Sequence, residues 1–217
     1  MLSYLHKRPA QPLTGSGGVL FYAIMATILF IDGENFRFKC KDVFDAAKIA
    51  NVDWNKFELD GLLDQVLSGI TINESRYYAA KIIIHPTTLD TSKRLQEQQR
   101  QLKLRLEKAG RKFIVAGRVR GQDTKDANGN SVVVFKEKGV DVQIGVDMVS
   151  LAADGLVDIA ILASSDSDLQ PAIKELVRRG KEVIYLGFER GLNKGMTYTT
   201  TRTMTIRDSE VLAHYHP

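Results

Sequence analysis

Two short acidic clusters follow apolar runs in this sequence, and their residue types suit divalent-metal chemistry. Asp32 comes directly after the run 26–31, and Asp166 and Asp168 come just after the run 157–163. One aspartate at the end of a strand can cap the next helix, but capping needs a single side chain, and here two aspartates lie two residues apart. Carboxylates held close together repel one another unless a cation neutralises them. Because hard oxygen ligands suit Mg²⁺ or Mn²⁺ better than zinc, the clusters predict a divalent-metal site.

A third acidic position is Asp141, which falls in the first turn of an expected helix. The helix dipole favours an anion there, which is also a purely structural reason for an aspartate. Asp147 lies six residues further on, on another side of the same helix, and is a lesser candidate. The residues expected to hold the metal are Asp32, Asp141, Asp166 and Asp168, with Asp147 as the lesser member.

Apolar runs and helical periodicity alternate along the chain and predict the elements that position these aspartates. Strands are expected at residues 26–31, 76–85, 112–116, 157–163 and 182–186. Helices are expected at residues 42–49, 54–67, 88–109, 140–153, 167–179 and 208–214. An Asn-Gly pair at 128–129 predicts a hairpin between residues 118–120 and 132–135.

This alternation predicts an α/β fold, a three-layer α/β/α sandwich with a central, mainly parallel sheet. In such sheets, sites form beyond the carboxyl ends of the strands, especially where the strand order reverses. We therefore expect the strands 26–31 and 157–163 to be neighbours, because their ends carry the two acidic clusters.

The length of 217 residues is enough for one full core. We expect a single domain over residues 25–217, with a polar hairpin insert near 117–139, and a leader or upstream extension over residues 1–24. The apolar run 19–31 is too short to span a membrane, so no membrane association is expected. The one cysteine, Cys40, excludes an internal disulfide and a cysteine-based zinc site, which fits a reducing compartment and a cytoplasmic location.

Positive charge is concentrated in the segment 90–125. This segment has a surplus of seven positive charges, against a net charge of +4 for the whole chain. A basic segment in an otherwise slightly acidic chain is typical of a protein with a phosphate-rich partner. A solvated helix face explains such a charge run as well.

Three motifs at the expected ends of elements resemble the signature motifs of the NYN domain family, a PIN-like group that includes the LabA-like bacterial proteins. They occur in the family's order, and the resemblance covers about residues 25–188. The motifs are IDGEN (31–35), KGVDV (138–142) and SSDSDL (164–169). One of them alone is weak because its residues are common, but the three together are specific.

The resemblance implies a PIN-like Rossmannoid sandwich that cleaves RNA with the help of a divalent metal. Carried over by motif, Asp32, Asp141, Asp166 and Asp168 look like the acidic metal-site residues. Asn35 looks like a residue that orients a carboxylate or contacts the substrate. Asp147 falls at a position that is often acidic in this group.

The expected chemistry is metal-assisted hydrolysis of a phosphodiester, in which a metal-bound water attacks phosphorus in line and metal charge stabilises the leaving oxygen. The expected partner is RNA, single-stranded in preference to duplex. Substrate-binding residues are expected to be Asn35, Ser165, Lys138, Arg118 and Arg120. The aromatic residues Tyr77, Tyr78 and Phe36 are candidates for stacking on bases, although the two tyrosines lie in a strand pattern and at least one of them is expected in the core.

Other functions stay open at this point. The nearest keeps the fold without the enzyme, as an RNA-binding or regulatory module. A phosphotransferase of the haloacid dehalogenase type needs a second aspartate two residues after the first, and position 34 is a glutamate. A topoisomerase-primase-like site needs a glutamate at the tip of the first strand, where Glu34 does not fall. The sequence leaves the oligomeric state open, a homodimer included.

Overall fold

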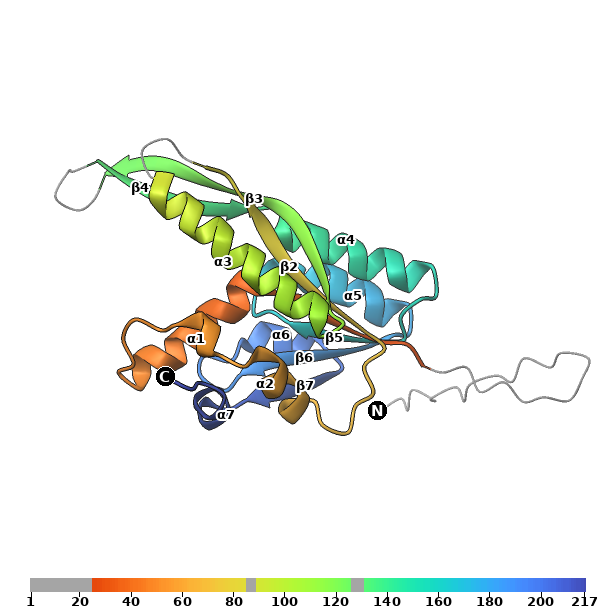
Figure 1. Ribbon diagram of the computed structural model, residues 1–217. Helices are drawn as coiled ribbons and strands as arrows, with labels where there is room; N and C mark the ends of the chain where they lie inside the picture. The colour runs from red at the N-terminus through yellow and green to blue at the C-terminus, as the bar shows by residue number, and fades with distance from the viewer. Residues whose placement is uncertain (1–24, 85–88, 126–130) are drawn as a thin grey trace, which may run out of the picture.

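The computed structural model describes residues 25–84, 89–125 and 131–217, which form one α/β unit around a seven-stranded sheet (Figure 1). The strands are β1 (Thr27–Asp32), β2 (Glu74–Ile82), β3 (Lys112–Lys125), β4 (Ser131–Lys138), β5 (Ile159–Ala163), β6 (Glu182–Phe188) and β7 (Arg202–Ile206). The helices are α1 (Gly33–Ala46), α2 (Leu59–Val66), α3 (Leu89–Lys108), α4 (Val140–Ala153), α5 (Gln170–Arg178), α6 (Lys194–Thr199) and α7 (Asp208–Ala213). Two 3₁₀ turns, η1 (Trp54–Lys56) and η3 (Ser167–Leu169), precede α2 and α5.

The strand order is β4-β3-β2-β1-β5-β6-β7. The pair β3–β4 is antiparallel and the other neighbouring pairs are parallel, so the sheet is mixed. The chain builds outwards from β1 through β2 on one side and from β5 on the other, so the order reverses at β1. The prediction that the first strand pairs with the strand before Asp166 is confirmed, because Ile31 lies opposite Ala163 in a parallel register.

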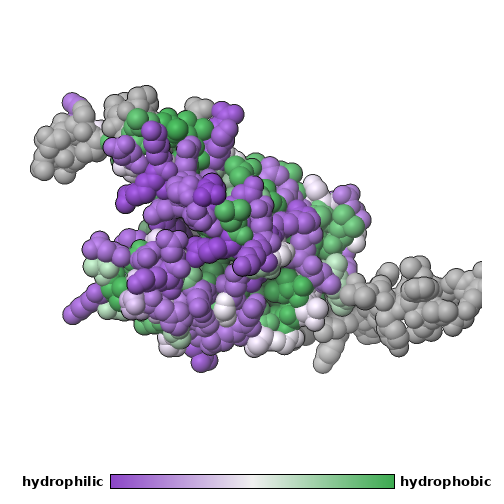
Figure 2. Space-filling model, viewed as in Figure 1, coloured by the Kyte–Doolittle hydropathy of each residue, from purple (hydrophilic) through white to green (hydrophobic). Residues whose placement is uncertain are grey.

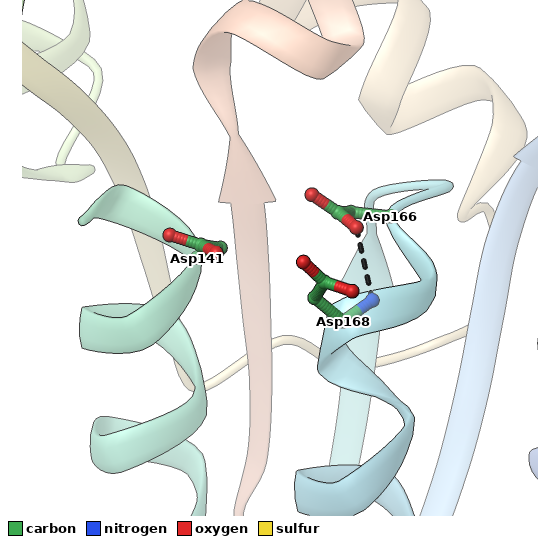
Figure 3. A group of neighbouring side chains, drawn as sticks. All are labelled: Asp141, Asp166 and Asp168. Atoms are coloured by element: carbon green, nitrogen blue, oxygen red, sulfur yellow. Dashed lines mark hydrogen bonds between the residues drawn. The ribbon is translucent and has the colours of Figure 1, made fainter. Parts of the chain in front are cut away.

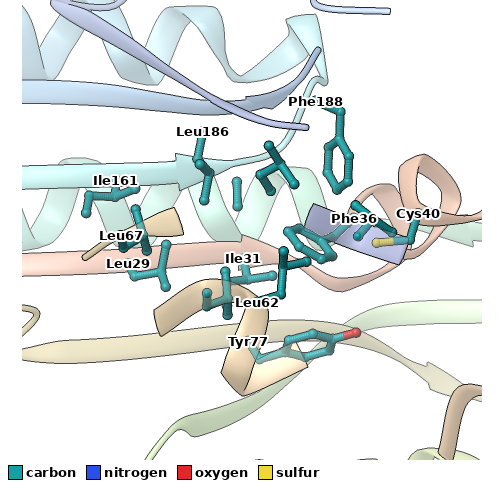
Figure 4. Close-up of a cluster of buried hydrophobic side chains, with 14 of the residues drawn as sticks. Leu29, Ile31, Phe36, Cys40, Leu62, Leu67, Tyr77, Ile161, Leu186 and Phe188 are labelled. Carbon is teal, nitrogen blue, oxygen red and sulfur yellow. The ribbon is translucent and has the colours of Figure 1, made fainter. Parts of the chain in front are cut away.

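Buried side chains gather on both faces of the sheet. Alternate residues of β1 point to opposite faces, with Leu29 and Ile31 in one cluster and Ile28 and Phe30 in the other. The first cluster packs against α1, α2 and α7 (Figure 4), and the second packs against α4, α5 and α6. The α/β class is therefore confirmed, with helices on both faces of the sheet.

The first helix begins nine residues earlier than the sequence pattern indicated. Helix α1 starts at Gly33, directly after β1, because the Asp32 carboxylate caps it by accepting a hydrogen bond from the Asn35 N–H. Its buried side chains, Phe36, Cys40 and Val43 among them, follow a helical spacing. The expectation of a helix limited to residues 42–49 was wrong because the acidic motif after β1 is itself the start of the helix.

Two further segments differ from the expected pattern. Strand β3 continues past Ala116 to Lys125, pairs with β4 and projects from the body of the molecule (Figure 1), while the turn expected at 128–129 lies outside the described residues. The region after Phe188 was expected to be irregular except for a last short helix, but α6 and the edge strand β7 form there. A short polar segment such as RTMTI has only a weak strand pattern in its sequence. It forms a strand here because it pairs with β6.

Candidate metal centre

Three aspartates meet beyond the carboxyl ends of β1 and β5, where the strand order reverses (Figure 3). One carboxylate oxygen from each of Asp141, Asp166 and Asp168 lies within 4.8 Å of the other two. Asp141 and Asp166 are half-buried and Asp168 is exposed, so the group opens to solvent. We refer to these three residues as the aspartate cluster.

The turn after β5 places two members of the cluster. Asp166 caps η3, and its Oδ1 accepts a hydrogen bond of 2.9 Å from the Asp168 N–H. Of the two aspartates in this turn, Asp166 is thus the one that caps the helix. The same turn holds Asp168 beside Asp166, so the pair comes from one short segment.

Asp141 reaches the cluster from the first turn of α4. The chain enters this helix through Gly139, which has a left-handed backbone with φ of 92°. Beside it, Gly117 of β3 has φ of +66°, and a Cβ on Gly117 would lie 2.2 Å from the Lys138 carbonyl oxygen. Glycine at position 117 therefore allows β3 to pass close to the start of α4.

Asp32 lies next to the cluster but is held by other contacts. It is 6 % exposed, and its Oδ2 accepts a hydrogen bond of 3.1 Å from the Ser164 hydroxyl. Burial raises the pKa of Asp32, the charges of Asp166 and Glu34 raise it further, and its hydrogen bonds oppose the shift. Asp32 is therefore a buried acid, and its hydrogen bonds with Asn35 and Ser164 join the start of α1 to the turn after β5.

Asn35 links the same two segments. Its side-chain oxygen accepts hydrogen bonds from the Ser165 N–H at 3.0 Å and from the Ser165 hydroxyl at 3.1 Å. The Asn193 side-chain amide donates to the Ser165 carbonyl oxygen at 2.8 Å. Ser165, a predicted substrate-binding residue, therefore uses its hydrogen-bonding groups to hold the turn that carries Asp166.

Asp147 is not part of the cluster. One of its oxygens accepts hydrogen bonds from the Tyr78 hydroxyl at 2.8 Å and from Arg76 at 3.2 Å. Its other oxygen accepts one from the Gln143 side chain at 2.7 Å. These contacts give Asp147 a structural role in joining α4 to β2.

The predicted basic residues lie on the hairpin arm. Arg118 of β3 and Lys138 of β4 are exposed and stand opposite each other in the register. Lys138 is three residues before Asp141, so this pair borders the start of α4. The side chain of Arg120 lies outside the described part of the structure.

The expectation that aromatic side chains stack on bases was wrong for Tyr77, Tyr78 and Phe36. All three are buried, Tyr78 completely, and pack within the two core clusters. Tyr78 has no exposed surface, and Tyr77 and Phe36 expose only 6 % and 3 % at the wall of a cleft, which is too little for a base to stack on a ring face.

Glu137 is an acidic residue near the cluster that the sequence did not single out. It is half-buried on β4, and burial together with the charges of Asp32, Glu34 and Asp141 raises its pKa to about 7. In the sequence it stands between two lysines of the hairpin, which suggests a solvated strand. Its position depends on the long-range pairing of β3 with β4, so no local signal marked it.

The donor set of the aspartate cluster fits a divalent cation. Oxygen ligands around one Mg²⁺ at about 2.1 Å lie about 3 to 4 Å apart. The three carboxylate oxygens all lie within 4.8 Å of one another, which is compatible with this spacing. The like charges also gain from neutralisation, and the first turn of α4 adds the positive end of a helix dipole.

Comparisons with known proteins bear on the fold and the family of this chain. A search of curated proteins finds no match. A crystal structure of a protein of unknown function from Vibrio parahaemolyticus is similar, with a TM-score of 0.55 and 18% sequence identity over 84% of this chain and 93% of that chain. This likeness shows the fold. The family model of the NYN domain matches residues 26–204, and the chain therefore belongs to the NYN domain family.

Proposed function

We propose that this protein is a metal-dependent ribonuclease whose centre is the aspartate cluster. The observation that carries the proposal is the meeting of three carboxylate oxygens within 4.8 Å at the reversal point of the sheet. Membership of the NYN domain family supports it, because this family has a PIN-like nuclease fold. The fold alone does not establish an activity, and the carboxylates of the aspartate cluster supply the chemistry.

Asp141, Asp166 and Asp168 would hold Mg²⁺ or Mn²⁺, with Asp32 as a buried acid beside them. When bound, the ion supplies positive charge toward the scissile phosphate and lowers the pKa of a coordinated water. Asn35 and Ser165 hold the turn that carries Asp166, so they position the cluster. Arg118, Lys138 and Arg120 are proposed to contact flanking phosphates from the hairpin arm.

The proposed substrate is single-stranded RNA, and the proposed location is the cytoplasm. In the described part of the chain, no helix combines the length and apolarity that crossing a membrane requires. Residues 1–24 lie outside the described part, and we propose that the domain begins at residue 25.

The test is cleavage of a mixed-sequence single-stranded RNA with Mn²⁺ or Mg²⁺. We expect Asp141→Asn and Asp168→Asn to lower the rate by about 100-fold or more, because each removes charge at the reacting centre. Asp154→Asn is the matched control, since Asp154 is an exposed aspartate at the far end of α4.

Equal cleavage by all the purified proteins would identify a contaminating nuclease and contradict the proposal. Binding of RNA by the parent without cleavage of any RNA tested would favour the alternative, a non-catalytic RNA-binding module of the same fold.

A further inference from the structure

A large cleft opens on the sheet face opposite α4 and α5, between α3 on one bank and α1, η1 and α2 on the other. Its volume is about 780 Å³, which is in the range of ligand-binding pockets. Figure 2 shows the molecule hollowed between these banks, with hydrophilic side chains along both. The cleft lies next to the proposed metal centre without including it.

The cleft is connected to the centre through acidic residues at one end. Glu34, two residues after Asp32, and Glu137 of β4 both line it. Asp32 directly precedes the lining residue Gly33, and Asp141 lies four residues after Glu137, so this end of the cleft faces the acidic region. A strand bound at the aspartate cluster can therefore continue into the cleft.

The interior of the cleft is mostly apolar. Leu102 and Leu106 of α3 line it from one side, Val119 of β3 from another, and Phe57 from the opposite bank. A phosphate loses its hydration at such a surface without compensation, whereas a nucleobase buries flat apolar faces there. The interior thus suits bases and not the charged backbone.

The bank formed by α3 carries a row of polar side chains. Its members follow one another at steps of four, three, four and three residues, which places them in one line along the helix, and all are exposed. They are Arg94, Gln98, Gln101, Arg105 and Lys108. Two members of the row, Gln98 and Arg105, line the cleft.

The opposite bank carries a flat cationic platform. The Arg37 guanidinium carbon lies 4.8 Å from the centre of the Trp54 ring, and both residues line the cleft. Arg105 of the α3 row reaches across and donates a hydrogen bond to the Asn55 carbonyl oxygen. A guanidinium stacked on an indole is a surface on which a base can stack.

Three further carboxylates line the cleft, Asp53, Glu58 and Asp60. Asp60 is paired with Arg111, Glu58 lies 3.4 Å from the His216 ring nitrogen, and Asp53 accepts a hydrogen bond from the Asn55 N–H as the cap of η1. Glu34 and Glu137 add acidic charge at the end that approaches the proposed metal centre.

We propose that this cleft holds unpaired bases of a single-stranded RNA while the row on α3 contacts its phosphates. The class of ligand rests on the proposed ribonuclease function. The geometry explains a preference for single strands, because a base enters the apolar interior only when it is not paired.

Trp54 makes the test direct, since it is the only tryptophan of the chain and lines the cleft. The experiment follows its fluorescence as the full chain is titrated with hexaadenylate in EDTA, where metal-dependent cleavage cannot occur. An abasic strand of the same length and charge is the second probe. We expect a saturable change with hexaadenylate and about ten-fold weaker binding of the abasic strand, because base stacking is lost.

Two matched pairs of variants locate the binding. Ala79→Leu fills part of the cleft and is expected to weaken hexaadenylate binding about ten-fold, whereas Ala153→Leu, on exposed α4 surface, leaves it unchanged. Arg94→Ala removes a cation of the row, and Lys93→Ala removes the neighbouring cation on another side of α3. We expect binding to weaken about three-fold in the first and to stay the same in the second.

Equal binding of hexaadenylate and the abasic strand would mean that the protein binds the backbone, and this result would overturn the proposal. The absence of a Trp54 fluorescence change, or equal binding of hexaadenylate by Ala79→Leu and the parent, would overturn it as well. The ribonuclease proposal is judged separately by cleavage with metal. Cleavage without a Trp54 response refutes the cleft alone, and a Trp54 response without cleavage refutes the nuclease alone.

Discussion

The side-chain oxygen of Asn35 accepts two hydrogen bonds from Ser165, 3.0 Å from its backbone nitrogen and 3.1 Å from its hydroxyl. This contact joins the first turn of α1 to the turn that carries Asp166 and Asp168. Asn35→Ala leaves the half-buried Ser165 N–H without this partner. We expect a loss of about 1 to 3 kcal/mol in the free energy of unfolding and about ten-fold weaker Mn²⁺ binding. Calorimetric titration with Mn²⁺ measures the second effect, and unchanged affinity in a folded variant would argue against a positioning role.

The aspartate cluster is expected to bind a divalent cation that stabilises the fold. At a Mn²⁺ concentration one hundred times Kd, the free energy of unfolding should rise by about 2.7 kcal/mol. Asp141→Asn and Asp168→Asn should lose this increase, and without metal they should be as stable as the parent or slightly more stable, because like-charge repulsion is relieved. Thermal unfolding with and without Mn²⁺ measures both effects. Asp154→Asn is the control, and a metal-induced increase that persists in the cluster variants would place the ion elsewhere.

Glu137 should make stability depend on pH. Its pKa rises from 4.5 to about 7 in the folded protein, so the unfolded chain releases this proton at lower pH than the folded one. The ionised carboxylate therefore lowers stability as pH rises from about 4.5 to about 7, and the loss is complete above that range. Glu137→Gln should be more stable than the parent at about pH 8 and equal to it at about pH 4. Urea unfolding at both pH values checks this, and an equal difference at both would contradict the titration of Glu137.

A side chain at Gly117 should disturb the entry to α4. Gly117→Ala places a Cβ 2.2 Å from the Lys138 carbonyl oxygen at a φ of +66°. We expect a loss of more than about 2 kcal/mol in stability, since steric overlap adds to the backbone strain. Gly155→Ala is the matched control, because Gly155 has φ of +70° with no atom within 4 Å of the added Cβ. It should lose only about 1 to 2 kcal/mol, and equal losses would mean that β3 moves away freely.

Asp147 should matter for stability and not for metal. Asp147→Asn weakens the contacts with Arg76 and Tyr78, so we expect a loss of about 1 to 3 kcal/mol in the free energy of unfolding. The increase in stability with Mn²⁺ should stay as large as in the parent. Chemical unfolding with and without Mn²⁺ separates the two effects. A loss of the metal-induced increase would return Asp147 to the set of metal ligands.

The sequence by itself determined the parts of this protein that depend on local pattern. The apolar runs before Asp32 and Asp166 predict buried parallel strands, and a parallel sheet brings the carboxyl ends of neighbouring strands to one edge. The three motifs predict the NYN domain family, which the family model confirms. Asp32, Asp141, Asp166 and Asp168 were therefore expected to converge. The structure brings the last three together, while Asp32 lies outside their cluster.

Tertiary structure decided what depends on long-range contacts. Glu137 approaches the acidic residues only because β4 pairs with β3, and β7 forms only because β6 offers it an edge. Tyr77 and Tyr78 lie in a strand pattern that predicts one of them in the core, and packing on the two faces of the sheet buries both. The cleft beside α3 is lined by α1, α2, α3 and the strands β2 to β4, which are distant in sequence. The periodicity of one segment does not predict the space that opens between several.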